Sequence, residues 1–200
     1  MIYGLVLAAG ESQRMGRPKL LLPLGEGTVI ENVLKRIKAS KLTGCLVVVN
    51  LKDKVISELA RRLSLEIVIN PQPERGMLSS IIAGISRLPS EAEAVVVFLG
   101  DQPLITSTLI DALIVSYRVK AKGIVVPTYK GKRGHPVLID LKYRQEITQL
   151  NPETGLRSLL WQHPEDVLEL PVEEAGVTVD LDTAEDYLRL LQELSAKNKS

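Results

Sequence analysis

Residues 5–24 read LVLAAGESQRMGRPKLLLPL, and this stretch decides which fold the chain is expected to adopt. Its apolar start is typical of a buried strand, which breaks into a loop of small residues: Ala8, Ala9 and Gly10. Such a loop lets a ligand approach the main chain, because no side chain larger than a methyl group intervenes. Three cations follow and would add positive charge to the free N–H groups of the loop: Arg14, Arg17 and Lys19. We therefore expect an anion-binding loop, with a strand-to-helix turn and solvated cations as the alternative.

This loop differs from two better-known phosphate-binding loops. A Walker loop requires G-x-x-x-x-G-K-[ST], but Lys19 follows Gly16 at a distance of three residues and precedes Leu20. A dinucleotide-binding loop requires G-x-G-x-x-G, which the residues after Gly10 do not supply. A different class of nucleotide-binding loop is therefore needed.

The string LAAGESQRMGRPKLLLP resembles the signature loop of the MobA-like nucleotidyltransferases, LAAGxSxRMGxxKxLLP. The resemblance extends along nearly the whole chain and implies a Rossmann-like nucleotidyltransferase fold, a nucleoside triphosphate substrate and Mg²⁺ as cofactor. It implies that the nucleotide is bound by the strand end and the loop: Leu7, Ala8, Ala9, Gly10 and Lys19. It also implies two catalytic cations, with Lys19 at the α-phosphate and Arg14 at the β- and γ-phosphates, whereas Arg17 is expected to be solvated.

Length and composition limit the number and size of the domains that can contain such a loop. The chain has 200 residues, of which 45% are hydrophobic, which is enough for one α/β domain with a full core. We expect that domain to cover residues 1–194 and residues 195–200 to form a polar tail. The formal net charge is +1, so no global field would attract nucleic acid or an anionic membrane. We expect neither as a partner.

The single cysteine and the start of the sequence both favour a cytoplasmic protein. Cys45 lies in the apolar run CLVVV and cannot form an internal disulfide, which is typical of a buried thiol in a reducing compartment. No charged region precedes the first apolar run, which is too short for a signal peptide or a membrane span.

Short β-branched runs alternate with helical patterns along the chain. This alternation predicts an α/β fold of three layers, in which a mostly parallel, twisted sheet has helices on both faces. Expected strands cover residues 2–7, 46–49, 66–69, 94–99, 124–127 and 136–139. Expected helices cover residues 29–39, 52–63, 78–88, 107–119 and 156–162. Ligands in such folds bind beyond the carboxyl ends of the strands, where the strand order reverses.

The loop after the third expected strand reads NPQPERGMLSS and carries further nucleotide-binding candidates. Hydroxyl and N–H groups at a helix N-terminus suit a ribose, a base edge or an anion, and ordinary helix capping is an equally good explanation. The stretch RGMLSS resembles the family's R-G-M-x-S-S, which lines the base and ribose. The resemblance therefore implies nucleotide contacts from Gly76, Ser79 and Ser80.

Two acidic segments are candidates for a metal site. Asp101 follows an apolar run, where a lone carboxylate would be costly without a cation or donors, and Thr106 fits the cap of the next helix better. Asp182 lies in VTVDLDTAEDY, where helix capping is the alternative. Mg²⁺ prefers about six oxygen ligands, so two carboxylates plus triphosphate oxygens would suffice. The strings GDQP and DLDTAEDY resemble the family's metal-binding segments, which implies Asp101 and Asp182 as ligands, with Asp180 less certain.

Two residues are candidates for binding the second substrate. His135 lies between Gly and Pro in KRGHP, where its ring is expected to face the cleft, although a lone histidine is more often structural. The resemblance implies that it positions the acceptor. Arg157 lies in NPETGLRS, which resembles a pterin-covering D-x-G-x-R loop, with Glu153 where Asp is usual. Arg157 could bind a phosphate through its guanidinium fork.

The resemblance implies that a phosphorylated acceptor attacks the α-phosphorus of a nucleoside triphosphate and releases pyrophosphate. LAAG together with GDQP is similar to the cytidylyltransferase branch, which attaches CMP to molybdopterin, so CTP is favoured over GTP. Ala9 in place of a second glycine would narrow the base pocket and suit a pyrimidine. The alternatives are a nucleotidyltransferase acting on a sugar phosphate or another small phosphorylated acceptor, and a nucleotide-sensing domain without turnover.

Overall fold

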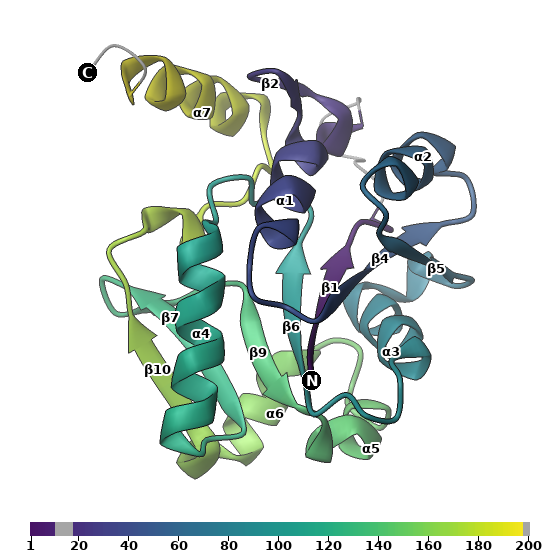
Figure 1. Ribbon diagram of the computed structural model, residues 1–200, viewed down its shortest axis with the longest axis vertical. Helices are drawn as coiled ribbons and strands as arrows, with labels where there is room; N and C mark the ends of the chain where they lie inside the picture. The colour runs from purple at the N-terminus through teal and green to yellow at the C-terminus, as the bar shows by residue number, and fades with distance from the viewer. Residues whose placement is uncertain (11–17, 198–200) are drawn as a thin grey trace.

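A computed structural model describes residues 1–10 and 18–197, and within them an eight-stranded sheet forms the centre of the fold (Figure 1). The sheet contains β1 (Ile2–Leu7), β4 (Gly44–Asn50), β5 (Glu66–Asn70), β6 (Ala94–Leu99), β7 (Ile124–Tyr129), β8 (Lys132–Arg133), β9 (Val137–Asp140) and β10 (Val167–Pro171). Its order is β10-β7-β9-β6-β1-β4-β5, and β8 pairs with β7. The strands β2 (Pro23–Leu24) and β3 (Gly27–Thr28) pair separately as a short antiparallel ribbon.

The sheet is mostly parallel, as predicted. The strands β6, β1, β4 and β5 are successive parallel neighbours, and β10 is parallel to β7. The two-residue strand β8 is antiparallel to β7, and β9 is reversed within the sheet, antiparallel to both β6 and β7. Because of this reversal, β9 begins at the edge where its neighbour β6 ends, and Val137 lies opposite Val97. The segment before β9 therefore reaches the carboxyl edge of the parallel strands.

Helices cover both faces of the sheet, which confirms the predicted three layers (Figure 1). The helices α1 (Val29–Lys38), α2 (Lys54–Arg62) and α4 (Ser107–Lys120) pack on one face. The helices α3 (Met77–Arg87), α5 (Arg144–Ile147) and α6 (Leu156–Gln162) pack on the other, and α7 (Ala184–Lys197) ends the described chain. Among the described residues, no helix combines the length and the apolar character that crossing a bilayer requires.

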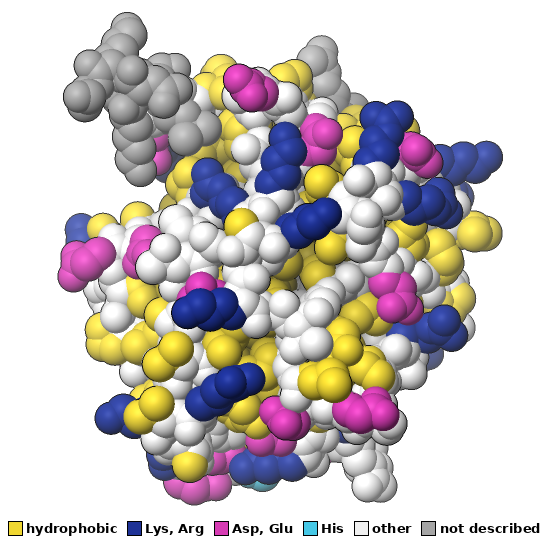
Figure 2. Space-filling model, in the orientation of Figure 1, with side chains coloured by type: hydrophobic (Ala, Val, Ile, Leu, Met, Phe, Trp, Pro, Cys, Tyr) yellow, Lys and Arg dark blue, Asp and Glu magenta, His cyan; other side chains and the backbone are white. Residues whose placement is uncertain are grey.

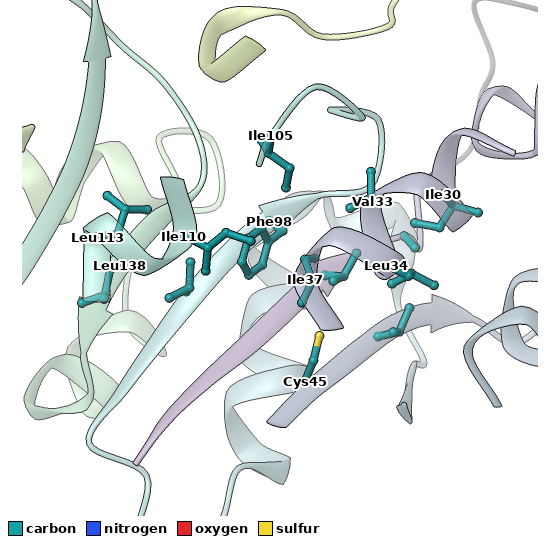
Figure 3. Packing of buried hydrophobic residues seen from close by; sticks show 14 of the residues in the cluster. Ile30, Val33, Leu34, Ile37, Cys45, Phe98, Ile105, Ile110, Leu113 and Leu138 are labelled. Carbon is teal, nitrogen blue, oxygen red and sulfur yellow. The ribbon is translucent and has the colours of Figure 1, made fainter. Parts of the chain in front are cut away.

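Alternating side chains of the central strands build two cores. In β1, Val6 belongs to the cluster beneath α1 and α4, whereas Leu5 belongs to the cluster beneath α3. Figure 3 shows the first cluster, in which apolar side chains of α1 and α4 surround Phe98. Cys45 lies in this core, as expected, and burial raises the pKa of its thiol to about 12.

Local sequence signals explain several element boundaries. Thr28 and Glu31 form a capping box at the start of α1, since the main-chain N–H of Thr28 donates to Glu31 Oε2 at 2.7 Å and that of Glu31 donates to Thr28 Oγ1 at 3.4 Å. The Thr106 hydroxyl caps α4 as predicted, accepting from the Leu109 N–H at 3.1 Å.

Four elements of the main fold lie outside the expected residue ranges, and the shortest of them is the two-residue strand β8. The strand β10 lies at the edge of the sheet, where none of its side chains is fully buried and a final proline is tolerated. Its sequence therefore lacks the apolar run that predicts a buried strand. The helix α5 spans only four residues, too few for a periodic signal. The helix α7 runs to Lys197 and so includes the first three residues of the segment expected to be a polar tail.

The turn before β9 is closely packed against the chain that carries the late acidic residues. The main-chain N–H of His135 donates to the Val177 carbonyl at 2.9 Å, and a Cβ atom added to Gly134 would lie 2.1 Å from that carbonyl oxygen. We expect Gly134→Ala to lower the free energy of unfolding by about 1–3 kcal/mol through overpacking. Urea denaturation measures this change, and Val119→Ala, at a 70% exposed position of α4, is the control expected to stay near wild type. A wild-type midpoint for Gly134→Ala would contradict the packing argument.

Candidate active site at the carboxyl edge of the sheet

The site lies where the strand order reverses. The chain leaves β1 toward β4 and β5 and then returns to β6 on the other side of β1, so the loops after β1 and β6 diverge at this point. The two strand ends approach closely, because Gly100 donates its main-chain N–H to the Leu7 carbonyl at 3.1 Å. A Cβ atom at Gly100 would lie only 3.0 Å from that oxygen. Glycine therefore lets Asp101 lie beside the loop after β1.

Lys19 joins the two acidic segments. Its Nζ lies 2.5 Å from Asp101 Oδ2 and 3.2 Å from Asp182 Oδ1, although these residues are 82 and 163 positions away in the sequence. Lys19 begins the 3₁₀ turn Lys19–Leu21, and Leu20 of that turn is anchored in the core. The structure thus brings together one predicted catalytic cation and both predicted metal ligands.

The electrostatics of this trio favour a charged lysine. Burial disfavours the ammonium form of Lys19, but hydrogen bonds and charge from Asp101 and Asp182 outweigh it and raise the pKa of Lys19. Asp101 is largely buried, with a side chain 15% exposed, whereas that of Asp182 is 49% exposed. A cation therefore lies between two carboxylates at the mouth of the site.

The predicted nucleotide loop begins directly at the end of β1. Ala8 donates its N–H to the Val48 carbonyl at 2.8 Å, and Gly10 is exposed. Ala8 and Ala9 are each 1% exposed and belong to opposite core clusters, so a ligand would meet their main chain rather than their methyl groups. This corrects the picture in which the Ala9 methyl lines the pocket itself. Arg14 and Arg17 lie outside the described residues.

Asn70 organises the first turn of α3. Its Nδ2 donates to Ser79 Oγ at 2.8 Å and to Ser80 Oγ at 2.9 Å. Ser79 Oγ also lies within hydrogen-bond distance of the Gln72 and Gly76 carbonyls, so it serves the loop, whereas Ser80 is 5% exposed. Asn70 was not a candidate from the sequence. Its signal was a polar side chain at the last position of a parallel strand, the place where ligands bind in parallel sheets.

Next to the Lys19 trio, a cavity of about 440 Å³ brings His135 and Arg157 together. Its other lining residues include Gln102, Asp180 and the 63% exposed Trp161. Burial lowers the pKa of His135, the charges of Asp180 and Asp101 oppose this, and that of Arg157 adds to it. The imidazole is therefore neutral at pH 7 and offers one donor and one acceptor. The cavity combines a cation, a carboxylate and an aromatic surface.

A hydrogen bond links the two acidic segments on the cavity side. Gln102 Nε2 donates to Asp180 Oδ1 at 2.7 Å. Gln102 is 2% exposed, and its Oε1 has no hydrogen-bond partner among the described residues. Gln102 was assigned no role from the sequence. An uncharged amide has both a donor and an acceptor, so its type alone does not indicate what it binds until its partner is known.

A second cavity, of about 540 Å³, lies between the end of β5, α3 and the chain at residues 148–152. It is lined by Ser79 and the two cations Arg75 and Arg87. Of the predicted site residues in the described chain, only Ser79 lines it. The larger cavity is therefore not where the predicted acceptor residues meet.

Charges on the surface are mixed rather than gathered by sign. On the face drawn in Figure 2, basic and acidic side chains are interspersed with hydrophobic ones. This distribution agrees with the net charge of +1. The positive charge of Lys19 at the site is therefore a local feature and not part of a basic surface on this face.

Asp101 and Asp182 fit a divalent cation by the convergence of their oxygens. Both carboxylates lie within 3.2 Å of one atom, Lys19 Nζ, so they already face a common cationic position. Within residues 1–10 and 18–197, no group of three or more His, Cys, Asp or Glu side chains could hold a metal. Mg²⁺ binds through one or two carboxylates plus substrate phosphates and water, which this pair can support.

Comparisons with known proteins identify a family and several relatives that this chain resembles. The family model described as the MobA-like NTP transferase domain matches residues 4–167. The chain is 27% identical over 186 residues to the molybdenum cofactor cytidylyltransferase of Escherichia coli (strain K12), covering 92% of both proteins. It is 30% identical over 201 residues to the nicotine blue oxidoreductase of Paenarthrobacter nicotinovorans, covering 95% of this chain and 96% of the relative. The structure of Rv0371C complexed with manganese, from Mycobacterium tuberculosis H37Rv, has 27% identity and a TM-score of 0.81, covering 96% of this chain and 98% of the other.

Proposed function

This chain belongs to the MobA-like NTP transferase family and is a nucleotidyltransferase, and we propose that it transfers CMP from CTP to the phosphate of molybdopterin, releasing pyrophosphate. The observation that carries the proposal is the contact of Lys19 with Asp101 and Asp182 beside the cavity that holds His135 and Arg157. This arrangement supplies a charged centre for a triphosphate and an adjoining space for an acceptor.

In the proposed step, an oxygen of the acceptor phosphate attacks the α-phosphorus in line. A new phosphoanhydride bond forms, the bond to the β-phosphate breaks, and pyrophosphate leaves with the electron pair. Because the acceptor phosphate is already ionised at neutral pH, no general base is required. The chain's contribution is therefore positioning and charge stabilisation.

Each residue of the trio has a part in that step. Lys19 would stabilise the charge that develops at the α-phosphate. Its ammonium group has three donors, so it could contact phosphate oxygens when these replace the carboxylate oxygens of Asp101 and Asp182 as its partners. Asp101 and Asp182 would hold Mg²⁺, which when bound neutralises charge on the phosphate oxygens. The loop from Leu7 to Gly10, together with Gly76, Ser79 and Ser80, would bind the nucleotide, and Arg14 would bind the β- and γ-phosphates.

The cavity supports a flat, anionic acceptor. Trp161 can stack against a planar ring, and Arg157 can pair with a phosphate. A sugar phosphate is the competing acceptor, since hydroxyl groups could also use the carboxylate and imidazole of the cavity. One relative is named a molybdenum cofactor cytidylyltransferase, which favours a molybdenum cofactor acceptor over a sugar phosphate.

The test is a matrix of two nucleotides and two acceptors, in which CTP or GTP is incubated with molybdopterin or a hexose 1-phosphate and Mg²⁺. One relative is named an oxidoreductase, so the readout must be specific to nucleotidyl transfer. Release of pyrophosphate is specific in this sense and is measured directly. We expect release with CTP and molybdopterin. Release only with the hexose 1-phosphate would overturn the assignment of molybdopterin as the acceptor. No release with either acceptor would overturn the proposed function.

We expect CTP to be preferred over GTP by roughly 1–3 kcal/mol, as a pocket-shape effect. Ala9 is buried in the same cluster as Leu78 and Ile81 of α3, so its methyl helps to set the spacing between the loop and the first turn of α3. Ala9→Gly should relax this preference without reversing it. Direct competition between the two nucleotides measures the ratio, and equal use of GTP by the wild type would contradict the cytidylyl assignment.

A further inference from the structure

The two acidic segments each supply one residue to the charged centre and one to the cavity. Asp101 and Asp182 contact Lys19, whereas their near neighbours Gln102 and Asp180 contact each other and line the cavity. The sequence places Asp180 only two positions from Asp182, which made both candidates for the metal site. Their partners in the structure distinguish them.

Gln102 holds Asp180 in a defined orientation. The amide is almost fully buried, at 2% exposure, and its Nε2 donates to Oδ1 of Asp180 at 2.7 Å. The reverse orientation of the amide would place Oε1 against the carboxylate, which is unfavourable because both are acceptors. The amide is therefore fixed with its donor toward Asp180. Asp180 lies outside any helix or strand, and this bond joins its side chain to the buried amide of Gln102.

The cavity has two chemically different parts. Arg157 and Lys132 supply donors and positive charge, whereas Asp180 supplies acceptor oxygens and is itself exposed to the cavity. A carboxylate is acceptor-only and can accept two parallel N–H bonds, so it matches a ligand edge that presents adjacent N–H donors.

We propose that Asp180, positioned by Gln102, is the specificity-determining carboxylate for the acceptor and binds adjacent N–H donors of a planar heterocycle, such as the pyrimidinone edge of a pterin. This inference rests on the proposed function and deepens it. It assigns Asp180 to the acceptor cavity and leaves the metal to Asp101 and Asp182. Gln102 is a positioning residue, because it acts through Asp180.

Binding of pterin itself, followed by fluorescence titration without nucleotide or metal, tests the inference. We expect the wild type to bind pterin and to bind 3-methylpterin at least about 10-fold more weakly, because the methyl group removes one N–H donor to a charged acceptor. Asp180→Asn should weaken pterin binding about 10-fold or more and lose the discrimination against 3-methylpterin. Glu173→Gln, at an exposed carboxylate of the same segment, should bind pterin as the wild type does.

Gln102→Met keeps the side-chain length and removes the donor, so it should weaken pterin binding and raise the KM for the acceptor. The KM for the nucleotide and the melting temperature should stay near wild type, which a merely structural role would not predict. The magnesium concentration for half-maximal turnover should rise in Asp182→Asn and stay unchanged in Asp180→Asn. Wild-type binding of pterin by Asp180→Asn, equal binding of both pterins by the wild type, or no pterin binding at all would overturn the inference.

These outcomes separate the inference from the proposed function. If pterin binds through Asp180 but no pterin-bearing acceptor receives a nucleotide, the function fails and the inference holds. If molybdopterin is turned over while pterin binding does not depend on Asp180, the function holds and the inference fails.

Discussion

Lys19→Ala is expected to lower kcat by about 10²–10³-fold, while nucleotide affinity falls only modestly. This is the size of effect found when one preorganised donor to a developing negative charge is removed. Lys19 Nζ already lies between two carboxylates, so it is held in place before a nucleotide arrives. Its interaction with the α-phosphate would be strongest in the transition state, and only such interactions raise kcat.

Steady-state kinetics at saturating Mg²⁺, with kcat and KM determined separately, measures the effect. Lys120→Ala is a suitable control, because Lys120 is an exposed cation at the last position of α4. Substitution of Lys19 also leaves Asp101 and Asp182 facing each other, so the folded state of the variant should be checked by its melting temperature. Equal losses in kcat and in nucleotide affinity would indicate ground-state binding instead of the proposed role.

The proximity of Lys19 and Asp101 could be predicted from the sequence, because the rule that places them together is topological. Lys19 and Asp101 each follow the end of a parallel strand, and the carboxyl ends of such strands meet at one edge of the sheet. The order and direction of the strands were harder to predict, since the sequence of β9 is an apolar run like those of the strands that are parallel to one another. Its reversal places His135 at the same edge as Asp101.

Residues that act through a partner escaped prediction. Asn70 and Gln102 are buried amides whose roles depend on groups from other segments, Ser80 for the first and Asp180 for the second. The sequence favoured Asp182 over Asp180 as a metal ligand through the family resemblance alone, because both are carboxylates in one short segment. Only the tertiary contacts distinguish the residue beside Lys19 from the one in the cavity.

Asp101→Asn is expected to lower magnesium-dependent turnover by about 10²-fold or more, because a carboxylate that holds a catalytic metal accounts for several kcal/mol of transition-state stabilisation. The fold should survive. Asp182 still pairs with Lys19 in this variant, so no buried charge is left without a partner. Thermal unfolding checks the fold, and a titration of turnover against Mg²⁺ checks the metal.

The magnesium titration separates a metal ligand from a residue that only orients Lys19. Loss of a ligand should shift the half-maximal magnesium concentration upward, whereas loss of the Lys19 contact alone should lower kcat at every magnesium concentration. Glu58→Gln is the matched control, since the ion pairs of Glu58 with Arg61 and Arg62 are exposed and lie within α2, where such pairs contribute little. Asp101→Asn activity equal to that of this control at ordinary magnesium would remove Asp101 from the metal site, and Asp182 would then be the remaining carboxylate beside Lys19.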